Sequence, residues 1–239
     1  MANIIKVDNA LLRRQKQKEK RVAKNRKVPC RILIVSEGEK TEPNYFRKFC
    51  VQHNSMFVYE VTCEGTGENT VKVVDKAISL RDSQIVPYDS VWAVFDRDSF
   101  PTQNFNAAIS KANANGINVA WSNEAFELWY LYHFQNRVTA MNRDDYKAAI
   151  SKAINNTGKW KGKKPYKYAK NDEQNYAIMT TFGDMDVAIR NAQKQHASFT
   201  DAYYASHNPC TTVYKLVLQL LNRDKELIDS VMRKINPYP

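Results

Sequence analysis

The sequence predicts an α/β fold: a parallel four-stranded sheet flanked by helices, followed by a helical C-terminal extension. Two observations lead to this prediction. Short apolar runs alternate with segments of helical period between residues 31 and 122, and short links join them. Beyond residue 123 the pattern is helical. Strands that alternate with helices form parallel sheets, because each helix carries the chain back across a face of the sheet.

The first predicted strand, RILIVS, spans residues 31–36 and is followed directly by a carboxylate, Glu37. Thr41 has the residue type of a helix N-cap and Pro43 suits a first turn, so a helix is expected to about residue 53. An alternating pattern predicts the next strand, and apolar residues at helical spacing predict the next helix. These elements cover residues 56–63 and 70–82.

The unbroken apolar run SVWAVFD, residues 90–96, predicts a buried strand. A helix at 103–115 and a fourth strand at 117–122 complete the sheet. Further helices are predicted at 123–134, 144–154, about 184–205 and 210–232. We therefore expect a basic tail at 1–29, an α/β core at 30–122, and a helical extension at 123–239 packed on the core.

Composition narrows the class of protein. No run approaches the roughly 18–20 apolar residues of a membrane span. The N-terminus lacks the apolar core of a signal peptide. The cysteines at 30, 50, 63 and 210 have spacings that suit neither a zinc knuckle nor a redox pair. We expect reduced thiols, a cytoplasmic protein, and oxygen ligands for any bound metal.

The net charge of +11 is concentrated in two segments. Residues 11–27 carry +8 and residues 159–170 carry +6, so the rest of the chain sums to −3. A slightly acidic body with two basic patches favours a polyanionic partner such as nucleic acid. The alternative is a solubilising tail and a solvated lysine loop.

Carboxylates follow the strands where α/β proteins bind their ligands. Asp96 and Asp98 flank Arg97 at the end of the third strand, and side chains two residues apart on an extended chain point the same way. If the first and third strands are neighbours, Glu37 converges with this pair. Three carboxylates need a cation or a shared proton to coexist, and an all-oxygen site suits Mg²⁺ or Mn²⁺. Each acid taken alone also suits a solvated turn or a helix cap.

Further acidic side chains lie near the same predicted edge. Glu124 and Glu127 follow the fourth strand. Glu127 stands in an aromatic stretch, where a charged side chain is costly to bury unless it orients a ligand or pairs with a lysine. Glu39 and Glu42 are candidates to complete the site, although both suit the start of a helix. Lys40 is a candidate phosphate contact or a solvated residue.

Two more segments carry candidate functions. In HNPCTT, residues 207–212, Asn208 or Thr211 is expected to cap a helix whose N-terminus can present N–H groups to a phosphate. In KWKGKKPYKYAK, residues 159–170, aromatic residues are interleaved with lysines in a loop that Gly162 and Pro165 keep from forming a regular helix. Exposed aromatics would stack on bases, which favours RNA over duplex DNA; the alternative is aromatics that pack on the body. The lysines proposed to bind nucleic acid are Lys161, Lys163, Lys164 and Lys167.

A glutamate after the first strand and Asp-x-Asp after the third resemble the Toprim domain of topoisomerases, bacterial primases and OLD-family nucleases. The motifs SEGEKTEPNYF, VFDRD, NEAFELWYLYHF and HNPCTTVYKLV together resemble the RloB family of AbiLii-like abortive-infection proteins, over about residues 31–222. NEAF departs from that family's pattern, in which proline is more common at its second position. The helical second half has no counterpart in topoisomerases.

The resemblance implies a metal-dependent nuclease in antiphage defence, with an ABC/AAA-type ATPase (RloA-like) as partner. It implies Glu37 as general acid/base and Asp96 and Asp98 as Mg²⁺ ligands, with Glu127 as a further catalytic candidate from the aromatic motif. The competing function is a Toprim-like scaffold that binds nucleic acid or the ATPase without cutting. Phosphoryl or nucleotidyl transfer is a more distant alternative. The oligomeric state is not predicted.

Overall fold

The computed structural model describes residues 28–52, 57–66, 70–97 and 101–235. The predicted basic tail thus lies outside the described residues up to position 27. The strands are β1 (Val28–Ser36), β2 (Phe57–Gly65), β3 (Ser90–Asp96), β4 (Asn118–Asn123) and β5 (Cys210–Thr211). The first helices are α2 (Thr41–Gln52), α3 (Thr70–Asp82), α4 (Thr102–Ala114) and α5 (Glu127–Tyr132). The others are α6 (Asp145–Asn156), α7 (Asn175–Phe182), α8 (Met185–Ala197), the 3₁₀ turn η1 (Tyr204–Ser206), α9 (Val213–Leu220) and α10 (Lys225–Ile235).

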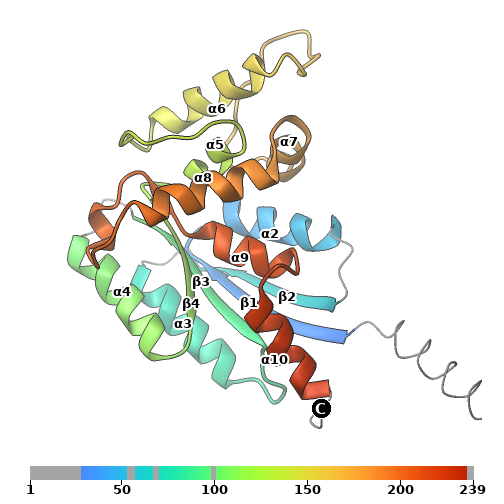
Figure 1. Ribbon diagram of the computed structural model, residues 1–239, viewed down its shortest axis with the longest axis vertical. Coiled ribbons are helices and arrows are strands. Elements are labelled where there is room, and N and C mark those ends of the chain that lie inside the picture. The colour runs from blue at the N-terminus through green and yellow to red at the C-terminus, as the bar shows by residue number, and fades with distance from the viewer. Residues whose placement is uncertain (1–27, 53–56, 67–69, 98–100, 236–239) are drawn as a thin grey trace, which may run out of the picture.

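The strands form one mixed sheet in the order β2-β1-β3-β4-β5 (Figure 1). The four predicted strands pair in parallel, and β1 and β3 are neighbours as the site prediction requires. The prediction of a four-stranded, purely parallel sheet is wrong, because β5 pairs antiparallel with β4. Ser122 lies opposite Thr211, and their hydroxyls are 2.9 Å apart.

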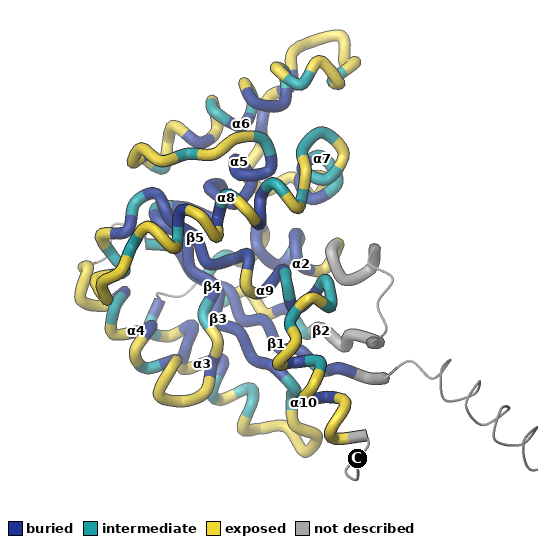
Figure 2. Tube along the Cα trace, viewed as in Figure 1, coloured by how far each residue is buried: buried dark blue, intermediate teal, exposed yellow. Residues whose placement is uncertain are grey.

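The sheet separates two apolar cores, as its period of two requires. Along β1, Ile32 and Ile34 belong to one core and Leu33 to the other. Helices α3 and α4 cover the second face, while α2, α9 and α10 lie on the first (Figure 1). Figure 2 shows the strands as a buried layer between exposed outer helix faces. Both faces are covered, which explains why β3 has no polar residue before its last position except Ser90.

Helices α5 to α8 gather beyond the carboxyl edge of the sheet, over the ends of β1, β3 and β4 (Figure 1). The aromatic run of α5 is the centre of this region, since Phe126, Trp129 and Tyr130 are each at most 1% exposed. These aromatics are therefore core residues. The site discussed below lies where this helical region meets the sheet.

Predictions for the helical half need several corrections. The helix predicted at about 184–205 ends at Ala197, and α7 was not predicted. The helix predicted at 210–232 is the strand β5 followed by α9 and α10, with Asn222 at φ 59 between the two helices. An apolar pattern that continues through a break looks like one helix, whereas β5 depends on pairing partners in β4 that are 87 and 89 residues away in the chain.

Cys30, Cys63 and Cys210 are buried free thiols. Burial raises the pKa of each thiol to about 12, so these cysteines behave as small apolar residues near neutral pH. Within the described ranges, each helix is too short or too polar to cross a membrane.

Candidate acidic site at the carboxyl edge of the sheet

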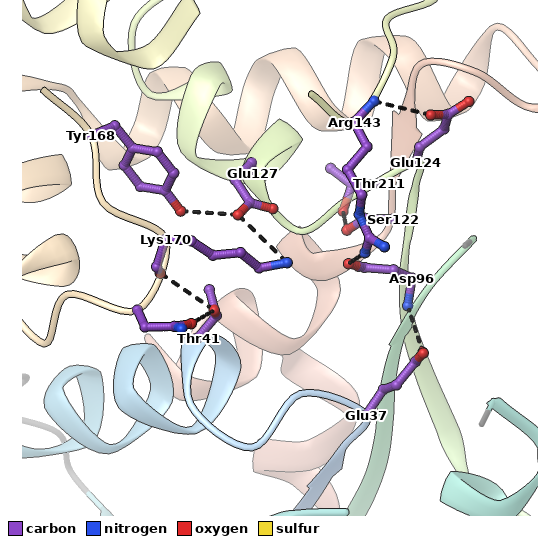
Figure 3. A network of polar contacts seen from close by, with 11 residues as sticks. Glu37, Thr41, Asp96, Ser122, Glu124, Glu127, Arg143, Tyr168, Lys170 and Thr211 are labelled. Atoms are coloured by element: carbon purple, nitrogen blue, oxygen red, sulfur yellow. Dashed lines mark hydrogen bonds and ion pairs between the residues drawn. The ribbon is translucent and has the colours of Figure 1, made fainter. Parts of the chain in front are cut away.

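Glu37 and Asp96 meet at the ends of two neighbouring strands. The parallel register pairs Ser36 with Val94, so the residues that follow come to the same edge. The backbone N–H of Glu37 donates to the Val94 carbonyl at 2.9 Å, and the N–H of Asp96 donates to Glu37 Oε2 at 3.3 Å (Figure 3). Glu37 and Asp96 therefore lie at neighbouring strand ends, while the Asp96 carboxylate itself contacts Arg143. Asp98, the third predicted member, lies outside the described residues.

Two further glutamates enclose this edge. Glu42 comes from the first turn of α2 and Glu127 from the first turn of α5, and each is only 5% exposed. Glu127 Oε1 accepts a hydrogen bond from the Tyr168 hydroxyl at 3.1 Å and lies 4.0 Å from Lys170 Nζ. The lysine partner expected for a glutamate in an aromatic stretch is thus present. Within the described part of the chain, Glu42 Oε2 and Glu127 Oε2 are buried oxygens without a hydrogen-bond partner.

The backbone beside Glu42 leaves room for its carboxylate only because residue 38 is glycine. A Cβ built at Gly38 would collide with Glu42 Oε2. Gly65, at the end of β2, is equally constrained, since its Cβ would lie 2.5 Å from Glu39 Cα and 2.7 Å from the Gly38 carbonyl oxygen. The turn that carries Glu37 is therefore packed tightly against β2 and α2.

Burial dominates the electrostatics of these acids. It raises the pKa of Asp96 well above the usual range, and the charges of Glu42 and Glu127 raise it further, whereas Arg143 lowers it. Burial is also the main cause that raises the pKa of Glu42 to about 7. Carboxyls with raised pKa values can hold or release a proton near neutral pH, as acid–base chemistry requires.

Two cations from the helical half of the chain enter the cluster (Figure 3). Arg143, in the segment before α6, places Nη2 3.1 Å from Asp96 Oδ2. Its backbone N–H donates to Glu124 Oε2 at 3.1 Å. Lys170 approaches Glu127, and its carbonyl accepts a hydrogen bond from the Thr41 hydroxyl at 3.4 Å.

Arg143 and Lys170 were not predicted as site residues. Lys170 was noted only as part of the lysine segment. Its position as the last lysine before α7 does not indicate that it pairs with Glu127. Arg143 stands in a polar stretch whose local pattern gives no signal, since its partner Asp96 is 47 residues away. Glu42 was a candidate from its motif, and the structure places it in the cluster.

The HNPCTT segment does not cap a helix as predicted. Residues 210 and 211 form β5, and α9 begins after Thr212. Asn208 instead directs Nδ2 toward Glu124 Oε1 at 3.5 Å, while His207 Nε2 is 2.9 Å from Asp201 Oδ1. This segment thus lies against the acidic edge through Glu124.

The lysine segment differs from the prediction in its aromatic residues. Tyr166 and Tyr168 are 7% and 2% exposed, and Trp160 packs edge-on against Tyr166. The interpretation as exposed stacking residues is wrong, because the aromatic rings cover the core between α6 and α7. The segment forms no regular helix, as predicted. Its lysines Lys161, Lys163, Lys164 and Lys167 are exposed, as is Lys40.

The donor set has the chemistry that a hard divalent cation prefers. Glu37 and Asp96 stand at neighbouring strand ends, Glu42 and Glu127 lie near enough to raise the pKa of Asp96, and two buried oxygens lack a partner among the described residues. No three His, Cys, Asp or Glu side chains in the described ranges are grouped closely enough to hold a metal ion. Asp98 lies outside those ranges, so the predicted three-carboxylate ligand set stays a prediction.

Fold and site together define an α/β protein with a mixed sheet, helices on both faces, and a buried carboxylate cluster at the carboxyl edge of its parallel strands. Residues 32–220 match the family of RloB-like proteins, and the chain belongs to that family. Neither a curated protein nor a solved structure matches the chain.

Proposed function

We propose that this protein is a Toprim-like, Mg²⁺- or Mn²⁺-dependent nuclease that hydrolyses phosphodiester bonds. The observation that carries this proposal is the convergence of Glu37 and Asp96 at the ends of neighbouring parallel strands. A glutamate after the first strand and an aspartate after the third are the positions on which the resemblance to Toprim nucleases rests.

In this proposal Glu37 is the general acid/base, and Asp96 and Asp98 hold the metal. The metal, when bound, neutralises charge on the phosphate and activates a water. Glu37 accepts a hydrogen bond from the N–H of Asp96, which holds its carboxylate at the end of β3, where the proposed site lies. Glu127 is fixed by Tyr168 and Lys170 and bounds the site from the helical side.

We further propose that the nuclease acts in the cytoplasm as an abortive-infection effector in antiphage defence, with an RloA-like ABC/AAA-type ATPase as its partner. Membership of the RloB-like family supports this role. The exposed lysines of residues 159–170 support a nucleic-acid substrate through phosphate attraction. Since both tyrosine rings of that segment are buried and Trp160 is partly buried against the core, base stacking no longer favours RNA there, and RNA and DNA are both to be tested.

The test is cleavage of labelled RNA and DNA by the full-length chain in Mg²⁺ or Mn²⁺. We expect Glu37→Gln to lower the cleavage rate at least about 100-fold, as removal of a general acid/base does, while binding is largely retained. Glu226→Gln, at an exposed position of α10, is the control and is expected to cleave normally. Equal cleavage rates for Glu37→Gln and wild type would mean that Glu37 has no catalytic role and is only a residue of the turn after β1.

Metal binding has its own test. The double substitution of Asp96 and Asp98 to Ala is expected to abolish Mg²⁺ or Mn²⁺ binding in calorimetry and to remove cleavage with the fold intact. The apo fold is expected to gain stability, since like charges are removed. Unchanged metal affinity would overturn the ligand assignment.

The alternative function is a Toprim-like module that binds nucleic acid or an ATPase without cutting. The same assay separates the two functions. Binding of oligonucleotides by the wild type without cleavage, in either metal and with the ATPase present, would favour the binding module.

A further inference from the structure

Arg143 extends from the helical half of the chain into the acidic site. Its guanidinium contacts Asp96 Oδ2 at 3.1 Å, where the Asp96 side chain is 8% exposed and that of Arg143 is 36% exposed. The carboxylate is therefore enclosed, whereas the Arg143 side chain is partly exposed to solvent. A ligand that enters the site from solvent would meet Arg143 before it meets Asp96.

The base of Arg143 is held by groups that belong to the sheet edge. Its backbone N–H donates to Glu124 Oε2, directly after β4, at 3.1 Å. The other oxygen of that carboxylate lies 3.5 Å from Asn208 Nδ2, just before β5. The antiparallel pairing of β4 with β5 brings Glu124 and Asn208 together. Arg143 is thus anchored through its main chain, independently of the contact that its side chain makes with Asp96.

A guanidinium can bind a phosphate as well as it binds a carboxylate. It carries five N–H donors in a planar fork, which match two phosphate oxygens with parallel hydrogen bonds. A cation fixed beside a reacting phosphate also stabilises the charge that develops in the transition state. In the acidic cluster such a cation offsets the repulsion that carboxylates exert on a polyanion.

We propose that Arg143 binds the phosphate of a phosphodiester substrate beside Asp96, and that Glu124 and Asn208 position Arg143 for this contact. The proposal rests on the proposed function, since it assigns a phosphate-binding residue to that site. It makes Arg143 a catalytic residue and Glu124 and Asn208 positioning residues.

The test is binding of fluorescein-labelled single-stranded RNA and DNA 20-mers, in EDTA so that no cleavage occurs. We expect Asp96→Asn to bind more tightly than wild type, because it removes repulsion and releases Arg143. Arg143→Gln is expected to bind about 10- to 100-fold more weakly, as loss of a charged hydrogen bond implies. The double variant is expected to bind far more weakly than Asp96→Asn and to keep only the gain from removed repulsion relative to Arg143→Gln. Arg190→Gln removes an exposed charge on α8 and is the matched control.

Two results would overturn the inference. Binding by Arg143→Gln equal to that of Arg190→Gln would place the phosphate elsewhere. Binding by the double variant as tight as that of Asp96→Asn would mean that Arg143 only neutralises Asp96. Arg143→Lys keeps the charge without the fork, and we expect it to recover part of the affinity.

The positioning role is tested in the same assay. Glu124→Gln keeps an oxygen that can accept the Arg143 N–H but loses the acceptor for Asn208 Nδ2, so its affinity is expected to lie between those of wild type and Glu124→Ala. Glu124→Ala is expected to lose affinity in the wild-type background but to add no loss to Arg143→Gln, as residues acting through one contact do. Additive losses would contradict this role.

Cleavage in Mg²⁺ separates this inference from the proposed function. If wild type cleaves neither RNA nor DNA, the proposed nuclease fails. If wild type cleaves and Arg143→Gln cleaves at the same rate, only the inference about Arg143 fails. We expect guanidinium ion to restore part of the cleavage by Arg143→Ala and to leave Glu37→Gln inactive.

Discussion

Glu42 is a buried acid whose environment favours the neutral form. Its carboxylate is 5% exposed and faces the backbone of Gly38, and burial raises its pKa from the ordinary 4.5 to about 7. The charges of Glu127 and Glu37 raise it further, whereas Lys170 lowers it. In the folded protein Glu42 therefore binds a proton that the unfolded chain releases between these two pH values.

This linkage predicts a pH dependence of stability. From about pH 4.5 to 7 the folded state binds more protons than the unfolded state, so the free energy of unfolding falls as pH rises. The contribution of Glu42 amounts to about 3 kcal/mol. Glu42→Gln is expected to be more stable than wild type at pH 8 and to lose that advantage by pH 4.5, in urea titrations without metal.

Asp96 keeps part of this slope in the Glu42→Gln variant, because its pKa is raised in the same direction. Glu39→Gln, an exposed neighbour, is the control and is expected to follow the wild-type curve. An unchanged slope in Glu42→Gln would mean that Glu42 is ionised in the folded protein throughout this range.

At the scale of elements, α9 is tied to the sheet by a buried side chain. Gln219 Oε1 accepts hydrogen bonds from Ser90 Oγ and Trp92 Nε1, both at 2.8 Å. Its Nε2 donates to Asp224 Oδ2 at 2.8 Å, beyond the end of α9. A single amide thus fixes the helix against β3 and holds the connection to α10.

Gln219→Met is expected to destabilise the fold by about 2–4 kcal/mol. The substitution preserves volume but leaves two buried donors without this acceptor, and each costs about 1–3 kcal/mol. Urea unfolding measures the loss. Gln193→Met, exposed on α8, is the control and is expected to change stability by less than about 0.5 kcal/mol. Equal midpoints for the two variants would contradict the proposed tie.

At the scale of the whole molecule, positive charge lies beside a negative site. The exposed lysines at 161–167 belong to the same segment that ends at Lys170 in the acidic cluster. The carboxylates repel a polyanion. The lysines could hold a polyanion close to the acidic site in spite of this repulsion. Such attraction depends on salt, because binding releases counterions.

We expect weaker oligonucleotide binding when Ala replaces four exposed lysines: Lys161, Lys163, Lys164 and Lys167. The affinity constant should also depend less on salt, so that the slope of log K against log salt becomes shallower by about one unit per lost phosphate contact. Titrations at several salt concentrations measure both effects. The control replaces four exposed lysines on other surfaces: Lys72, Lys76, Lys194 and Lys225. Equal slopes for both variants would assign the contacts to another surface, such as residues 11–27.

Local patterns were sufficient for the parallel core and for two carboxylates of the site. The runs that form β1 and β3 are apolar because both faces of the sheet are buried. The sequence therefore shows where these strands end, and it places Glu37 and Asp96 at those ends. The helix at 70–82 could also be predicted from the sequence, since its buried residues recur at helical spacing.

Long-range packing supplied what the patterns lacked. A two-residue strand such as β5 has no pattern of its own and exists because β4 offers it a partner. The tyrosines of the lysine segment became core residues because α5 and α6 left apolar surface for them to cover. Arg143 and Lys170 belong to the site for a similar reason. Each forms an ion pair that the tertiary structure creates, and local sequence patterns do not predict contacts between residues 47 or 43 positions apart.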